Sequence, residues 1–568
     1  MDSEKKTRTW LPLWVGVGIA IGIFIGNKYS MFTQTGAEGG KNKLSAVLNY
    51  INSSYVDKVD MNELVEDALL KIVQGLDPHS AYISAKDMKR VNEELEGQFS
   101  GIGVSFYVLR DTIVVTSIVP GGPSEAVGIV PGDRIVKVGD SIVAGTSITN
   151  DKVLKILRGE KGSEVTLAIK RSNHKDLKNI IVTRGNIPVK SIPVSYMLTD
   201  KIGYIKVETF ASTTFNEFIS AISKLKNLGS DSFVIDLRGN VGGKLDIVIA
   251  MVNEFLDKGQ LIVYAEGRDF PRVDNYADGS GTCKKDQVVV LIDEMSASAS
   301  EIFSGAIQDH DRGLVMGRKS FGKGLVQSQQ DFPDGSAVRL TIARYYTPSG
   351  RSIQRKFEKG HYDEYEMTAI NRYIQGDYAN VDTTMNLQPA ETDGGRTVYG
   401  GDGIMPDIFI PRDTLGINSY YNTLVNTGLL LDYAMVYSDM YRDKLDKFDS
   451  WMELYKHLLR QPLLDNLVSY ADNKGVRPRP YYIQESSLLL EKQLYAFIIR
   501  NFFDEEGVYS ILLKDDTLMR KSVEMIETGK ATPQAVLSEQ YKSATVFNDS
   551  RLFRFYDHLN LISSSNFI

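Results

Sequence analysis

The sequence predicts a multidomain chain of the α+β and α/β classes, with an apolar N-terminal segment and a helical C-terminal region. Its 568 residues are too many for a single hydrophobic core at the usual domain size of about 150 residues. Its composition, 42% apolar and 24% charged, is that of a chain that folds. Short β runs, then alternating strands and helices, then helical spacing follow one another along the chain, which indicates successive domains.

Charge and cysteine content exclude several kinds of protein. The chain has 65 Lys and Arg against 72 Asp and Glu, so no basic excess attracts phosphates and we expect no nucleic-acid partner. Cys283 is the only cysteine, which excludes an intramolecular disulfide and a cysteine-based zinc site. The six histidines show no metal-ligand spacing. We therefore expect neither a metal nor a cofactor.

An uncharged apolar segment near the N-terminus predicts a membrane anchor. Residues 10–26 (WLPLWVGVGIAIGIFIG) would rise about 25 Å as a helix, near the lower limit for crossing a bilayer. No small-x-small cleavage site follows, which favours an uncleaved anchor over a removable signal peptide. Lys5, Lys6 and Arg8 precede the segment, so residues 1–9 are expected in the cytoplasm. These residues predict a single-pass membrane protein whose remainder, after about residue 27, faces outward.

Changes of pattern predict the domain boundaries. We expect a flexible linker at residues 27–43, followed by a helical region at 44–96 and a β domain with short helices at 97–185. An α/β core at residues 186–412 and a C-terminal helical domain at 413–568 complete the chain. Residues 355–400 predict an insertion in the α/β core that either shapes access to a site or forms a surface loop. In the last region, Trp451 and Phe497 each belong to a set of apolar residues at helical spacing. These aromatic side chains indicate either core packing or an oligomer contact, and the second alternative would make the protein a homo-oligomer.

The β domain contains a glycine turn, Gly101-Ile102-Gly103-Val104, that opens a strand. A plain β-hairpin explains this turn alone, but residues 117–124 (SIVPGGPS) and 131–135 (PGDRI) follow in an order that resembles a PDZ domain. The resemblance implies that the turn binds a terminal carboxylate through backbone N–H groups and that the peptide adds a strand beside it. The peptide site is expected at Gly101, Ile102, Gly103, Val104, Val153 and Leu157.

Two stretches of the α/β region contain candidate catalytic residues. Residues 296–301 (SASASE) follow an apolar strand and begin a helix, so Ser298 lies where helix N–H groups stabilise a developing oxyanion. Lys323 stands between two glycines in the second stretch, residues 321–327 (FGKGLVQ). Taken alone, Ser298 and Glu301 form the pattern of a capping box, which needs no catalysis.

The second stretch also approaches a phosphate-binding P-loop, because Gly317 and Gly322 precede Lys323 at the required spacing. Gly324 occupies the position where that loop has Ser or Thr, and residues 325–329 predict a strand where the loop requires a helix. Nucleotide binding is therefore a minor hypothesis.

The order of Ser298, Lys323 and Gln327 resembles the signature of the carboxy-terminal processing proteases, also called tail-specific proteases. These are Ser/Lys peptidases with an embedded PDZ domain. Further matching motifs lie at residues 76–80 (LDPHS), 236–243 (DLRGNVGG), 345–354 (YYTPSGRSIQ) and 403–407 (GIMPD). The resemblance covers residues 44–411, with Val241 at a position where the family usually has proline.

The resemblance implies that Ser298 is the nucleophile, Lys323 the general base and Gln327 the residue that orients Lys323. Such a lysine must be neutral although a free one titrates at about 10.4, and burial can lower its pKa. The implied oxyanion hole combines the backbone N–H of Ala299 with that of Gly242 or Gly243.

The anchor and the resemblance together imply a single-pass protein of the inner membrane with its catalytic part in the periplasm. We therefore predict a membrane-anchored serine endopeptidase that recognises the C-terminal tails of unfolded or flexible envelope proteins and cleaves them. The alternative is a catalytically inactive PDZ scaffold of the cell envelope. A scaffold would bind tail peptides and leave them intact.

Overall fold

The computed structural model describes residues 39–109, 111–171, 176–358, 361, 364–365, 367–368, 371–372 and 388–534. The predicted cytoplasmic segment 1–9 and membrane anchor 10–26 lie outside these residues. Within the described ranges, no helix combines the length and the apolar character that crossing a bilayer requires. The chain divides into two compact units, Met1–Leu76 and Asp77–Ile568.

The first unit contains helices α2 (Gly39–Ser54) and α3 (Met61–Gln74). Asp60 begins α3, because its carboxylate accepts hydrogen bonds from the N–H groups of Asn62 and Glu63. Helix α2 begins before the predicted end of the 27–43 linker, so the last part of that segment is helical. Glycine is tolerated at a helix start, and the lysines and the leucine that follow are good helix formers.

In the second unit, residues of the β domain form one antiparallel sheet in the order β3-β4-β5-β7-β8. The strands are β3 (Val104–Leu109), β4 (Thr112–Ile118), β5 (Arg134–Val138), β7 (Glu164–Lys170) and β8 (Lys178–Thr183). The short strand β6 (Ser141–Ile142) pairs with β5, and helices α5 (Pro123–Ala126) and α6 (Asn150–Leu157) complete the domain. Among the described strands, β3 pairs only with β4 in this sheet, so its other edge makes no strand pair.

The α/β core is built on a mostly parallel sheet in the order β10-β11-β12-β15-β16-β21. Its strands are β10 (Ser195–Met197), β11 (Ile202–Lys206), β12 (Ser232–Asp236), β15 (Gln287–Ile292), β16 (Leu314–Gly317) and β21 (Ile408–Phe409). Successive residues of β15 pack into two different cores: Val288 and Val290 on one face, Val289 and Leu291 on the other. Both faces of the sheet are therefore covered, as apolar runs in parallel strands require.

Different helices cover the two faces. Helices α7 (Thr214–Asn227), α8 (Leu245–Asn253) and α9 (Ala299–Asp309) pack on the first face. Helix α18 (Thr517–Glu527) packs on the second through Leu518, Met519, Met525 and Ile526. The predicted boundary at residue 413 therefore does not separate two independent cores, since part of the C-terminal region completes the α/β sheet.

A second sheet in the order β1-β18-β13-β14 stands beside this core, with β17 also paired to β18. It consists of β1 (Ala81–Ile83), β13 (Leu261–Glu266), β14 (Val273–Tyr276), β17 (Leu325–Asp331) and β18 (Ala337–Tyr346). The remaining pairs are β2 (Gln98–Gly101) with β9 (Gly185–Pro188), and β19 (Gln388–Glu391) with β20 (Thr397–Gly400). Helix α4 (Ala85–Glu96) leads from β1 to β2.

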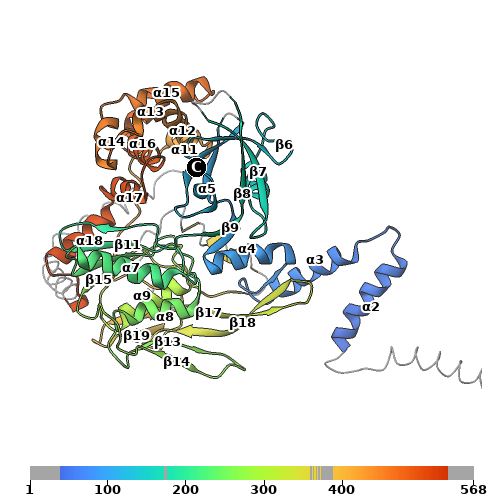
Figure 1. Cartoon of the computed structure of the whole chain (residues 1–568). Coiled ribbons are helices and arrows are strands. Elements are labelled where there is room, and N and C mark those ends of the chain that lie inside the picture. Colours follow the sequence, from blue (N-terminus) through green and yellow to red (C-terminus); the bar gives the residue numbers. More distant parts are fainter. Residues whose placement is uncertain are drawn as a thin grey trace, which may run out of the picture. The chain divides into compact units, whose positions relative to one another are not determined.

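The C-terminal helices form a core of their own (orange in Figure 1). They are α11 (Ser419–Asn426), α12 (Leu429–Met440), α13 (Arg442–Leu445), α14 (Trp451–Leu458), α15 (Leu463–Asn473), α16 (Pro480–Arg500) and α17 (Glu505–Leu513). Trp451 and Phe497 both pack against that core, which agrees with core packing for these aromatic side chains. Helix α12 also reaches the β domain, where Val436 contacts Leu109 and Val114.

We expect Leu494→Ala to lower the free energy of unfolding of this helical core by about 2–5 kcal/mol, because it leaves a cavity. Leu494 is 0% exposed, whereas Leu488 on the same helix α16 is 81% exposed, so Leu488→Ala is the matched control. A fragment beginning at residue 39 contains Trp451 as its only tryptophan, and the fluorescence of Trp451 during denaturant unfolding measures the change. Equal effects of the two substitutions would contradict the assigned core.

Candidate active site

Ser298 lies between the carboxyl end of strand β15 and the start of helix α9. Its backbone has φ 54° and ψ −110°, a conformation that residues with a side chain rarely adopt. Such strain persists only where surrounding contacts impose it, and it concentrates at functional sites. The structure therefore presents Ser298 at the helix start that the sequence predicted, in a geometry that simple capping does not require.

The contacts that impose this geometry converge on Glu301. Its carboxylate accepts hydrogen bonds from the backbone N–H of Ser298 at 2.9 Å and from that of Lys323 at 2.8 Å. The N–H of Gly322 and the hydroxyl of Ser320 donate to its other oxygen at 2.7 and 2.5 Å. Because Glu301 is 0% exposed, one buried carboxylate holds the serine and the lysine stretches together.

Burial has opposite effects on the two ionisable groups at this point. It raises the pKa of Glu301, against the four hydrogen bonds that favour the carboxylate. It lowers the pKa of Lys323, and the positive charge of Arg339 lowers it further, while Glu301 and Asp77 oppose the shift. The surroundings of Lys323 thus favour a neutral amine more than water does.

Gln327 follows Lys323 on strand β17. The Lys323 ammonium nitrogen Nζ lies 3.4 Å from Gln327 Oε1, within hydrogen-bond reach. The amide nitrogen of Gln327 donates to the backbone carbonyl of His79, which fixes the oxygen of the amide toward Lys323. Within the described residues, no hydrogen bond joins Ser298 Oγ to Lys323 Nζ in this conformation.

The His79 carbonyl belongs to a turn at residues 77–80, and the residue pattern alone did not identify this turn as part of the site. Asp77 accepts hydrogen bonds from the N–H groups of His79 and Ser80, each at 2.8 Å. The hydroxyl of Thr341 on strand β18 donates to the same carboxylate at 3.1 Å. The turn is thereby fixed beside β17, and its carbonyl is held where Gln327 can reach it.

Tyr365, from the predicted 355–400 insertion, contacts His79 and Phe321 near the site. Its hydroxyl lies 2.9 Å from His79 Nε2, and its ring packs edge-on against Phe321. The guanidinium of Arg355 lies 4.0 Å from the ring centre. Burial lowers the pKa of His79 to about 4, so this imidazole is neutral near pH 7. Within the insertion, Arg355 and Tyr365 therefore pack against Phe321 at the start of the Lys323 stretch.

The turn after strand β12 brings two glycines against the serine. A Cβ atom added to Gly242 would lie 2.8 Å from Ser298 Cβ, and its φ of +107° also requires glycine. The N–H of Gly242 donates to Asn240 Oδ1 at 2.8 Å. No hydrogen bond among the described residues uses the N–H of Ala299 or of Gly243, so these two donors are available in this conformation.

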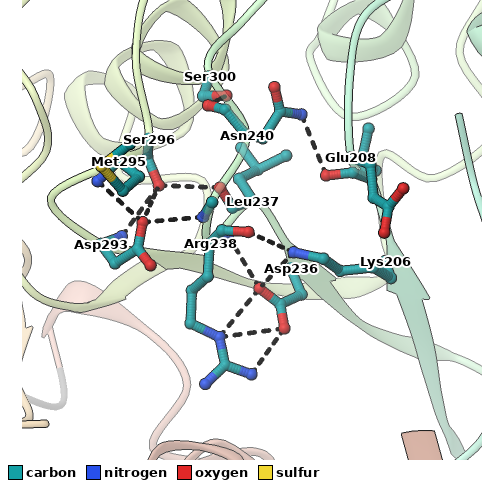
Figure 2. A network of polar contacts seen from close by, with 12 residues as sticks. Lys206, Glu208, Asp236, Leu237, Arg238, Asn240, Asp293, Met295, Ser296 and Ser300 are labelled. Atoms are coloured by element: carbon teal, nitrogen blue, oxygen red, sulfur yellow. Dashed lines mark hydrogen bonds and ion pairs between the residues drawn. The ribbon is translucent and has the colours of Figure 1, made fainter. Parts of the chain in front are cut away.

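A charged network lies beneath this turn, and Figure 2 shows it at the ends of β11 and β12. Asp236 forms ion pairs with Arg238 at 2.7 Å and with Lys206 at 3.6 Å. Burial alone would raise the pKa of Asp236, but the two cations lower it well below its usual range. Asp293 accepts a hydrogen bond from the N–H of Gly239 at 2.9 Å. The network therefore fixes the start of the glycine turn.

The expected peptide site of the β domain begins with residues 101–104, which run from the end of β2 to the start of β3. In the part of the chain that the structure describes, no hydrogen bond uses the N–H of Ile102 or that of Gly103. The side chains of Val153 and Leu157 are buried in the core of the domain, so in this conformation they do not line an open surface.

The geometry around Lys323 differs from that of a P-loop. Strand β17 follows the lysine where a helix would be required. The N–H groups of Gly322 and Lys323 are already bound to Glu301, so they are not available to a phosphate.

Three matches to protein families cover most of the described chain. Residues 201–362 match peptidase family S41, residues 100–182 match the PDZ domain family, and residues 420–504 match a family of unknown function, DUF8443. A probable CtpA-like serine protease of Staphylococcus aureus (strain COL) is 36% identical over 371 residues, covering 62% of this chain and 73% of the relative. A protein of the same description from Staphylococcus haemolyticus (strain JCSC1435) is 38% identical over 366 residues, covering 62% of this chain and 72% of the relative.

Solved structures show related similarities. A photosystem II D1 C-terminal processing protease is 27% identical, covers 55% of this chain and 89% of its own, and has a TM-score of 0.32. The PDZ domain of a carboxy-terminal protease from Vibrio cholerae is 27% identical over 16% of this chain and 97% of its own, with a TM-score of 0.15. On the family and sequence matches, the chain belongs to peptidase family S41 and is a serine-type C-terminal processing peptidase with a PDZ domain.

Proposed function

We propose that this peptidase cleaves proteins with a Ser298/Lys323 dyad and selects them by C-terminal tails bound to its PDZ domain. The observation that carries the proposal is the shared carboxylate of Glu301, which binds the backbone N–H groups of both Ser298 and Lys323. A structural capping residue needs only the first of these contacts.

In the proposed reaction, neutral Lys323 takes the proton of the Ser298 hydroxyl while Oγ forms a bond to the scissile carbonyl carbon. The resulting oxyanion accepts hydrogen bonds from the N–H groups of Ala299 and Gly243. The Lys323 ammonium then gives its proton to the leaving amine as the peptide bond breaks. Lys323 next takes a proton from the water that attacks the acyl-enzyme, and it gives this proton to Ser298 Oγ as the ester bond breaks, which restores the serine hydroxyl and the neutral lysine.

The Ser298 and Lys323 side chains complete their contact when substrate binds, because catalytic hydrogen bonds often tighten only in that complex. Gln327 limits this movement, since its amide is held by the His79 carbonyl and accepts from Lys323. Between the two glycine donors, Gly243 is favoured because the N–H of Gly242 is bound to Asn240.

The proposal for tail recognition rests on the unpaired edge of β3 and on the unengaged N–H groups of Ile102 and Gly103. A terminal carboxylate can accept from these N–H groups while the tail extends the sheet. We further propose that residues 10–26 anchor the protein in the inner membrane and that its substrates are unfolded or flexible proteins of the envelope. Its support is the uncharged sequence of that segment.

We expect Ser298→Ala and Lys323→Ala each to lower kcat/KM by about a thousandfold or more, because each removes a group that moves in the transition state. The assay follows cleavage of one loosely folded protein carrying either an apolar or a charged C-terminal tail. Ser328→Ala, on the exposed part of strand β17, is the control and should keep full activity. Tail binding without any cleavage by the unmodified protein would instead support the scaffold hypothesis.

We expect Glu301→Gln to lower kcat by about a hundredfold, because an amide cannot accept from all the donors that now share the carboxylate, and hydrogen bonds to charged groups contribute about 1.5–3 kcal/mol each. Removing the charge would also lower the pKa of Lys323, since Glu301 raises it. A loss of rate would therefore reflect lost positioning. Glu254→Gln is the control, because that buried carboxylate binds Thr282, away from the dyad. Unchanged kcat in Glu301→Gln would contradict the positioning role.

We expect Arg339→Gln to move the acidic limb of the kcat/KM pH profile to higher pH. Arg339 lowers the pKa of Lys323, so its removal raises that pKa and keeps the lysine protonated up to a higher pH. Arg344→Gln, an exposed position of the same strand, is the control. If the acidic limb of the kcat/KM profile does not move in Arg339→Gln, a group other than Lys323 sets the pH of that limb.

A further inference from the structure

Arg238 forms ion pairs with two carboxylates, and the second comes from a part of the chain far along the sequence. Its Nε and Nη2 atoms donate to Asp236, which lies two residues before it. Its Nη1 atom donates to Asp516 Oδ2 at 2.8 Å. Asp516 lies outside the residues that match the peptidase family and outside those that match DUF8443. The C-terminal region therefore reaches the turn that carries the glycine donors.

Asp516 is itself held firmly. Its other oxygen, Oδ1, accepts from the N–H of Met519 at 2.7 Å, so the carboxylate also caps helix α18. The first residues of that helix, Leu518 and Met519, pack on the sheet of the α/β core. The carboxylate is thus fixed relative to strands β15 and β16, and it gives Arg238 a rigid partner.

Arg238 directly precedes Gly239, the first glycine of the turn. Lys206 donates to the carbonyl of Arg238 (Figure 2), and Asn240 then holds Gly242 through its side chain. The carbonyl of Asn240 accepts a hydrogen bond from the hydroxyl of Ser300 at 2.8 Å, and Ser300 lies in the first turn of helix α9, two residues after Ser298. A shift of Arg238 would be passed along this short segment to Gly243.

We propose that Asp516 is a positioning residue for the oxyanion hole, acting through Arg238 on residues 239–243. This inference rests on the proposed function, because it assumes that Gly243 N–H binds the oxyanion. Asp236 binds the Nε and Nη2 atoms of the guanidinium and Asp516 binds Nη1, so Asp516 supplies a contact that Asp236 does not.

The expected effect is moderate because the pair is partly solvated. The Arg238 side chain is 18% exposed and lines a cavity of about 800 Å³ together with Asp516. Water in this cavity can replace part of the lost interaction, and Asp236 retains its own contacts. We therefore expect a loss of about tenfold in kcat, well below the loss expected for the dyad.

The test uses the full chain in detergent and compares Asp516→Asn with Asp516→Glu. Asparagine keeps a side-chain oxygen that can cap helix α18, and it removes the charge that Arg238 binds. Asp515→Asn is the matched control, since Asp515 is the adjacent carboxylate, is mostly exposed and pairs with Lys492. We expect kcat to fall about tenfold in Asp516→Asn with KM unchanged, to recover largely in Asp516→Glu and to stay constant in Asp515→Asn.

A second readout separates oxyanion stabilisation from general loss of structure. A peptide aldehyde forms a tetrahedral adduct with the nucleophile, so its affinity should fall by the same factor as kcat, while binding of a tail peptide should not change. Met525→Ala is the stability control, because it weakens the packing of the last turn of α18, away from Asp516, and leaves the carboxylate in place. If Met525→Ala loses kcat as Asp516→Asn does, or if Asp516→Asn raises KM alone, the inference is overturned.

The outcomes also distinguish this inference from the proposed function. Full kcat in Asp516→Asn, together with an inactive Ser298→Ala protein, overturns the inference and leaves the dyad in place. Cleavage by Ser298→Ala would overturn the dyad itself.

Discussion

The arrangement of the active site depends on one buried carboxylate. Glu301 is fully buried, yet four donors from two separate stretches of chain satisfy it. A buried charge without such partners would cost several kcal/mol. The same group binds the backbone at Ser298 and at Lys323, and a backbone hydrogen bond from Phe321 to Ser296 also joins the two segments. The proposed dyad requires that these two segments meet, and Glu301 is one of the groups that join them.

Around this point, the protein controls the charge of Lys323 by burial and by its neighbours. Arg339 and the low-dielectric surroundings favour the neutral amine, while Glu301 and Asp77 favour the ammonium. The balance suits a group that must first accept a proton and later donate it. Gln327 adds no charge, and its amide is oriented by a backbone carbonyl, so it constrains Lys323 without disturbing this balance.

Much of this site could be predicted from the sequence, because local patterns carry it. The apolar strand before Ser298, the glycines around Lys323 and the strand after it are short-range features, and the structure contains them. The resemblance to a known family added the pairing of the two stretches and the glycine turn. The capping-box pattern of Ser298 and Glu301 also gave a real contact, namely the hydrogen bond from the Ser298 N–H.

The remaining features arise from tertiary contacts that no local pattern encodes. Glu301 also binds the Lys323 stretch, the His79 carbonyl holds Gln327, and Asn240 occupies the N–H of Gly242. Helix α18 covers one face of the α/β sheet although its residues lie within the C-terminal helical region. The sequence predicted helices there from their spacing, but helical spacing shows only that one face is apolar and not which surface covers it.

The most direct test of this account is the titration of Lys323 itself. In Ser298→Ala protein with lysines labelled with ¹³C at Cε, the Lys323 signal can be assigned by its absence from a spectrum of Lys323→Arg protein in the same background. The account predicts that the pKa of this lysine lies below the value of about 10.4 for a free lysine, because burial lowers it, and below the pKa of the exposed lysines of the chain. Titration at or above that value would contradict a neutral Lys323 as the base.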